Sequence, residues 1–163
     1  MRVRLSEMTS KDLLKGVDSK TLERSKKLRS IYVKLSPSGD VIYRTTSGTI
    51  KNKYWEQIIR FGDSFKKVKE LFKGDRKVSS SDVLNLILSG DIKLHCNDPS
   101  WKYWGWQYIG TQLGYALRPE NRAPMIRNPR MRGSLCKHLI SVLSQLPKDL
   151  EKISRDMAKA GRK

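Results

Sequence analysis

The sequence predicts an α+β fold: a small antiparallel sheet with short helices, and a C-terminal half in which distant side chains meet at one site. Three observations lead to this prediction. Residues 30–46 alternate between apolar and polar side chains on both sides of a turn, which is typical of a β-hairpin. Residues 64–73 and 134–147 place apolar side chains at helical spacing. Both cysteines and both histidines lie in two tight clusters, at 95–96 and 136–138.

The length of 163 residues suits one domain with extended ends. We expect a basic helical arm at 1–29, a single α+β domain at 30–147 and a charged tail at 148–163. No run of 18 apolar residues is present, so no membrane span is predicted, and the first residues lack the apolar core of a secretory signal. Two cysteines do not make a disulfide framework, which favours a reducing, intracellular location.

The N-terminal half carries local start and stop signals. Ser10 can cap a short turn ending at Gly16, and Asp18 or Ser19 can cap a helix that continues to Arg29. The hairpin at 30–46 turns at residues 37–40, where proline and glycine favour a reversal. Residues 54–61 can add a strand with Trp55, Ile59 and Phe61 on one face, although a helix also fits.

The next elements are a helix, a shorter helix and a strand. Asp63 or Ser64 opens the first helix and Gly74 ends it; its apolar face comprises Phe65, Val68, Leu71 and Phe72. Residues 79–82 cap a second helix that Gly90 ends, and a strand is the alternative for this apolar run. A strand at 91–96 follows. The last helix begins near Ser134 and ends at Pro147, after which we expect a frayed helix or a solvent-exposed tail.

The two cysteine–histidine clusters point to a metal site, because zinc prefers four ligands of this kind. Cys136 and His138 are spaced i, i+2 at the start of a helix. His95 and Cys96 are adjacent and would point to opposite faces of a strand, whereas Cys96 and Asp98 have the i, i+2 spacing before a proline. The preferred ligands are therefore Cys96, Asp98, Cys136 and His138, and the C-terminal half is predicted to be zinc-stapled. The alternatives are His95 in place of Asp98, buried thiols without metal, and a Cys96–Cys136 disulfide.

The pattern Cys96-x-Asp98-Pro99-Ser100-Trp101 followed by Cys136-x-His138-Leu139 resembles a SWIM-type zinc finger, over roughly residues 91–146. That family has the form C-x-C-P-x-aromatic, then C-x-H at a helix start. Asp98 stands where the family has its second cysteine. The resemblance implies a non-enzymatic module that binds DNA or protein. The longer string from Cys96 to Leu139 also resembles small proteins encoded by tailed bacteriophages.

An aromatic stretch lies between the two clusters, formed by Trp101, Tyr103, Trp104, Trp106 and Tyr108. On a strand, Trp104, Trp106 and Tyr108 would share a face with Lys102. These rings can stack on nucleic-acid bases beside cations, or they can form the core around the metal site. As candidate nucleic-acid contacts we single out Lys102, Trp104 and Trp106.

Arginine is the basic residue of the following segment. Residues 118–132 contain no lysine and one acid, Glu120, and their arginines are Arg118, Arg122, Arg127, Arg130 and Arg132. The planar guanidinium group suits bidentate contact with phosphate, and three prolines keep the segment extended. The alternative is a solvated loop that makes local ion pairs.

The charge of the whole chain indicates the kind of partner. It has 34 Lys and Arg against 16 Asp and Glu, a net charge of +18, and no nucleotide-binding glycine loop or free catalytic histidine. We therefore expect a non-enzymatic, zinc-binding protein that binds nucleic acid, with DNA favoured and no membrane partner. The alternative is a phage head or neck component whose contacts are with other viral structural proteins. Either function places the protein in the host cytoplasm or in the virion.

Overall fold

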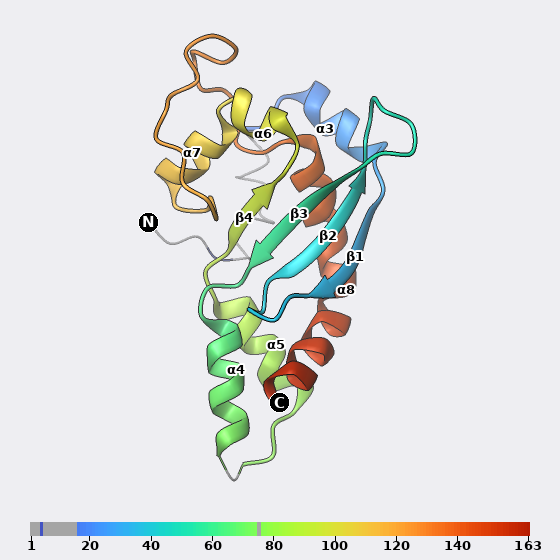
Figure 1. Ribbon diagram of the computed structural model, residues 1–163, viewed down its shortest axis with the longest axis vertical. Helices are drawn as coiled ribbons and strands as arrows, with labels where there is room; N and C mark the ends of the chain where they lie inside the picture. The colour runs from blue at the N-terminus through green and yellow to red at the C-terminus, as the bar shows by residue number, and fades with distance from the viewer. Residues whose placement is uncertain (1–3, 5–15, 75) are drawn as a thin grey trace.

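The computed structural model describes residues 4, 16–74 and 76–163 (Figure 1). The strands are β1 (Ser30–Leu35), β2 (Val41–Thr46), β3 (Tyr54–Arg60) and β4 (Lys93–Cys96). The helices are α3 (Ser19–Lys26), α4 (Ser64–Lys73), α5 (Ser80–Ser89), α6 (Pro99–Tyr103), α7 (Trp106–Leu113) and α8 (Lys137–Gly161). The α+β class predicted from the sequence is therefore confirmed. None of the helices in the described residues is long and apolar enough to cross a membrane.

The four strands form one antiparallel sheet in the order β1-β2-β3-β4. The predicted hairpin is β1 and β2, and its turn includes Gly39 at φ 85°. The strand interpretation of residues 54–61 is confirmed, because β3 pairs with both β2 and β4. Residues 115–117 run along the free edge of β4, where the Leu94 amide donates to the Tyr115 carbonyl at 2.7 Å and the Leu117 amide donates to the Leu94 carbonyl at 2.8 Å.

Helix α8 covers one face of the sheet, and the core lies between them (Figure 1). The strands direct Tyr43, Ile59 and Leu94 into this core, where they are fully buried together with Leu139 and Leu146 of the helix. In Figure 1 the other face of the sheet, toward the viewer, has no described helix over it. Consequently, apolar side chains such as those of Ile31 in β1 and Tyr54 in β3 are exposed there.

The prediction that the last helix ends at Pro147 is wrong, and residues 148–163, predicted as a frayed helix or a solvent-exposed tail, are helical but packed on the core. Helix α8 continues through Pro147 to Gly161, and Ile153 and Met157 are buried. A proline inside a helix costs about 3 kcal/mol. Burying each of these apolar side chains returns roughly 1.5–3 kcal/mol, so packing of the second half outweighs the proline. The N-cap of the helix is Cys136, two residues after Ser134, as expected for a cysteine–histidine pair at the start of a helix.

The other helices begin and end close to their predicted signals. Asp18 caps α3, accepting a hydrogen bond from the Thr21 amide at 2.9 Å. Ser79 and Asp82 form a capping box at the start of α5, which is a helix and not the alternative strand. The predicted cap at Ser10 lies outside the described residues.

Candidate metal centre and nucleic-acid interface

Three of the four preferred metal ligands meet in the interior. The ligand atoms of Cys96, Cys136 and His138 all lie within 4.8 Å of one another, and all three side chains are buried. Cys96 is the last residue of β4, Cys136 is the N-cap of α8, and His138 lies in the first turn of that helix. A tetrahedral ion with metal–ligand distances of about 2.0–2.3 Å holds its ligand atoms about 3.3–3.8 Å apart, a separation that lies within this limit. Both cysteines are free, so the disulfide alternative is not what the structure contains.

Asp98 lies beside this group. It is the N-cap of α6, where its Oδ1 accepts a hydrogen bond from the Ser100 amide at 3.0 Å. Its Oδ2 is 3.0 Å from Nδ1 of His138. This close contact does not have the direction of a hydrogen bond, and neither ring nitrogen of the fully buried His138 has a hydrogen-bond partner in the described residues.

Apart from this contact with Asp98, the fully buried imidazole has no polar partner among the described residues that meets hydrogen-bond geometry, which is costly unless another group binds the ring. A metal ion between two thiol sulfurs and one imidazole nitrogen would supply the missing partner. The carboxylate of Asp98 could complete the set as a fourth ligand or hold the ring through its second nitrogen. The residues present therefore fit a metal ion, and sulfur ligands favour zinc over magnesium or calcium.

The electrostatics of the group follow from burial and mutual contact. Burial opposes ionisation of Cys96, but the contacts with Cys136 and His138 outweigh it and lower the pKa of its thiol to about 6. Burial and the neighbouring Cys96 raise the pKa of Cys136. Burial disfavours charge on Asp98 as well, yet the His138 ring and the Ser100 amide bring its pKa down to about 2. Metal binding requires thiolates and a neutral imidazole, so an ion would displace the protons that remain here.

A second layer of polar side chains supports the two thiols. The Gln57 side-chain amide donates to Sγ of Cys96 at 3.6 Å and its Oε1 accepts from the Thr45 hydroxyl at 2.7 Å. The Leu139 amide donates to Sγ of Cys136 at 3.5 Å, as expected for a cap at a helix N-terminus. Sequence reasoning missed Gln57. The sequence feature that could have revealed it is a polar glutamine between Trp55 and Ile59, on the face of β3 that is otherwise apolar.

His95 lies on the opposite face of β4 from Cys96. It pairs with Ile58 while Cys96 pairs with Gln57, and successive strand residues point to opposite faces. The side chain is buried, and burial together with the charge of Arg118 lowers its pKa to about 4. The metal-capable group in the described residues includes neither His95 nor Asp98, but Asp98 contacts His138 whereas His95 faces the other side of the sheet. The geometry thus offers no support for His95 in place of Asp98.

No protein-family model, curated protein or solved structure matches this chain. The two resemblances noted in the sequence therefore remain hypotheses.

The aromatic stretch is helical, and the strand arrangement considered for it is wrong. Trp101 lies in α6 and is buried in the core. Trp104 and Trp106 flank the turn into α7, where their rings stack with centroids 6.0 Å apart. The Trp104 side chain remains 41% exposed, whereas Trp106 is half-buried. The core interpretation holds for Trp101, and Trp104 keeps a surface that another ring could contact.

Residues 118–132 are here called the arginine segment. All five of its arginines are exposed. Arg122 forms a bidentate ion pair with Glu120 at 2.9 and 3.0 Å, and Lys102 lies 3.6 Å from the same carboxylate. The contact with Arg122 is the main reason why the pKa of Glu120 falls to about 2. The local ion-pair alternative therefore applies to Arg122. For Arg127, Arg130 and Arg132, no carboxylate among the described residues lies within 4.0 Å.

Proposed function

We propose that the protein is a non-enzymatic, zinc-binding protein that binds nucleic acid, with DNA favoured, through its arginine segment. The observation that carries the proposal is the position of Arg127, Arg130 and Arg132. They are exposed, have no described carboxylate partner, and immediately precede the buried metal-capable cluster. Exposed arginines without a carboxylate partner in the described residues, on a protein of net charge +18, provide the sequence-independent attraction to phosphate that most nucleic-acid binding requires.

Zinc would have a structural part in this function. The segment leaves the sheet where residues 115–117 pair with β4 and enters α8 at Cys136. An ion held by Cys96 of β4 and by Cys136 and His138 of α8 would fix these two ends relative to each other. Four protein ligands, with Asp98 as the fourth, would leave no open position for a catalytic water. The C-x-D and C-x-H pattern supports the SWIM-like interpretation, and the second resemblance supports a bacteriophage setting, in host cytoplasm or virion.

The test is a salt titration of binding to a fluorescein-labelled duplex. Affinity should fall steeply with salt, with a log–log slope of about −0.9 per phosphate neutralised. Replacing Arg127, Arg130 and Arg132 by alanine should make that slope less steep by up to about three units. A slope unchanged in this variant, with the metal still bound, would exclude these arginines as the phosphate contacts.

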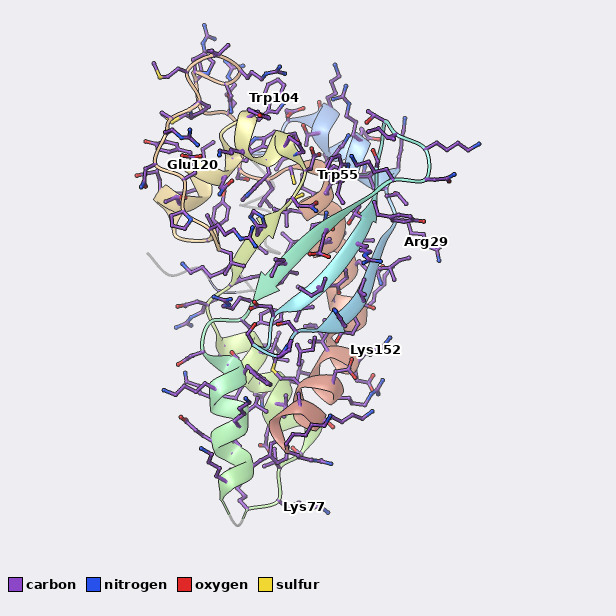
Figure 2. The ribbon with its side chains drawn as sticks, in the orientation of Figure 1. Arg29, Trp55, Lys77, Trp104, Glu120 and Lys152 are labelled. Carbon is purple, nitrogen blue, oxygen red and sulfur yellow. The ribbon has the colours of Figure 1, made fainter. Side chains whose placement is uncertain are left out.

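A matched control removes the same charge elsewhere. Lys66, Lys73 and Lys77 are exposed and belong to α4 and the α4–α5 connection, at the end of the molecule opposite α6 and α7 (Figures 1 and 2). Their alanine variant lowers net charge equally but should change the slope less. Equal changes in both variants would indicate binding by overall charge and not by the arginine segment.

A second candidate function is a phage head or neck component that contacts other proteins. It is favoured by the open face of the sheet, where Ile31 and Tyr54 are exposed. Such a protein should form ordered assemblies in the absence of nucleic acid, which sedimentation velocity would detect. The same assemblies combined with an unchanged salt slope in the arginine variant would favour this function over nucleic-acid binding.

A further inference from the structure

The arginine segment has an apolar tip that none of its described neighbours covers. Met125 is 76% exposed and Ile126 is 92% exposed, although both are side chains that proteins normally bury. In Figure 1 the connection between α7 and α8 projects beyond both α6 and α7. Across from this tip, Tyr103 of α6 is 64% exposed.

Contacts on both sides hold the tip in place. On the N-terminal side of the tip, Pro124 is buried against Gly105. The two residues are so close that a Cβ atom added to Gly105 would lie 2.1 Å from Cγ of Pro124. After it, the buried Asn128 side chain donates to the carbonyls of Trp104 at 3.0 Å and Arg132 at 2.8 Å, and accepts from the Arg132 amide at 2.9 Å. The tip is thus presented in a defined position, which lowers the entropy lost when it contacts a partner.

A groove of about 680 Å³ lies between α6 and this loop. Tyr103 lines one part of it and Met125 and Ile126 line another, together with Lys102, Arg122 and Arg127. The one carboxylate among its lining residues, Glu120, is already paired with Arg122 and Lys102. Three cations against one carboxylate leave an excess of positive charge, so the fitting ligand is an anion with an apolar or aromatic part.

We propose that this groove binds one unstacked nucleotide of a single-stranded nucleic acid. The inference rests on the proposed function and specifies its ligand. The base would stack on the Tyr103 ring and contact Met125 and Ile126, while Lys102 and Arg127 would contact the flanking phosphates. Such a pairing of stacking rings with a cationic groove is what single-strand binding uses, and it tolerates any base. A volume of this order takes a group the size of one nucleotide and not a double helix.

The experiment compares a short labelled oligothymidylate with a duplex of the same length, by fluorescence anisotropy at fixed salt. Alanine removal of a stacking ring typically weakens binding by between about 5- and 150-fold. We expect a loss in this range for Tyr103→Ala with the single strand and a smaller loss with the duplex. Tyr103→Phe should retain affinity because it keeps the ring. Tyr54→Ala is the matched control, since Tyr54 is also an exposed tyrosine but lies on β3, and it is not among the residues that line the groove.

Three results would overturn the inference. Equal affinities of Tyr103→Ala, Tyr54→Ala and the unaltered protein, with salt-dependent binding intact, would reject base stacking while leaving the proposed function standing. Absence of binding to either nucleic acid by the unaltered protein would reject the proposed function and this inference with it. Binding to phosphatidylcholine–phosphatidylserine vesicles that Ile126→Ser abolishes, with oligothymidylate binding unchanged, would assign the tip to a membrane surface instead.

Discussion

Replacing Cys136 by serine should separate metal binding from helix capping. The Cys136 sulfur has two possible tasks in the structure: it belongs to the metal-capable group, and it accepts the Leu139 amide at the start of α8. Serine is among the preferred N-cap residues, so Cys136→Ser keeps the cap and removes one thiolate ligand. The change should therefore act mainly on zinc affinity.

The size of the effect follows from linkage. A ligand that binds only the folded state stabilises it by about 4.1 kcal/mol when its free concentration is about 1,000 times its dissociation constant. In a chain of 163 residues, each kcal/mol moves the melting temperature by about 2–4 °C. The unaltered protein should therefore melt roughly 8–16 °C higher with such an excess of zinc than with a chelator. Cys136→Ser should lose most of this difference.

The assay is thermal unfolding with buffered zinc and with chelator, combined with elemental analysis of the purified protein. Because the zinc-dependent difference is taken within each variant, the packing cost of the substitution cancels. Leu135→Ala is the matched control: Leu135 is buried and adjacent, so the variant should melt lower but keep its zinc-dependent gain. The metal hypothesis is refuted if the purified unaltered protein holds no stoichiometric metal and zinc raises the melting temperature of neither the unaltered protein nor the Leu135→Ala variant.

Three further predictions follow from particular contacts. Asp98→Cys should preserve or tighten zinc binding and His95→Ala should leave the metal content unchanged; metal retained in Asp98→Ala but lost in His95→Ala would move the site to the other histidine. Ile153→Ala should lower the free energy of unfolding by about 2–5 kcal/mol in a denaturant titration, because its side chain is fully buried, whereas a loss under about 0.5 kcal/mol would return residues 148–163 to a solvent-exposed tail. Gly105→Ala should displace Pro124, because the added methyl group has no room and φ is +74° there; trypsin should then cut the arginine segment faster, and unchanged cleavage would contradict the packing described.

The sequence by itself determined the local elements and the chemistry of the candidate site. The alternation of apolar and polar side chains in residues 30–46 predicted the hairpin of β1 and β2, and Asp18 and Ser79 marked the starts of α3 and α5. These signals depend on residues only a few positions apart, so they survive without knowledge of the rest of the fold. The i, i+2 spacing of Cys136 and His138 was equally local, and residue type alone indicated zinc.

Only the tertiary structure decided what depends on distant packing partners. Pro147 is a valid stop signal on its own, but helix α8 continues because the core receives Ile153 and Met157. Gln57 reaches the sulfur of Cys96 only because β3 and β4 pair in that register. The groove beside Tyr103 likewise exists because α6 and the arginine segment come together. Burial and pairing between segments far apart in the chain set these features, and no short stretch of sequence contains that information.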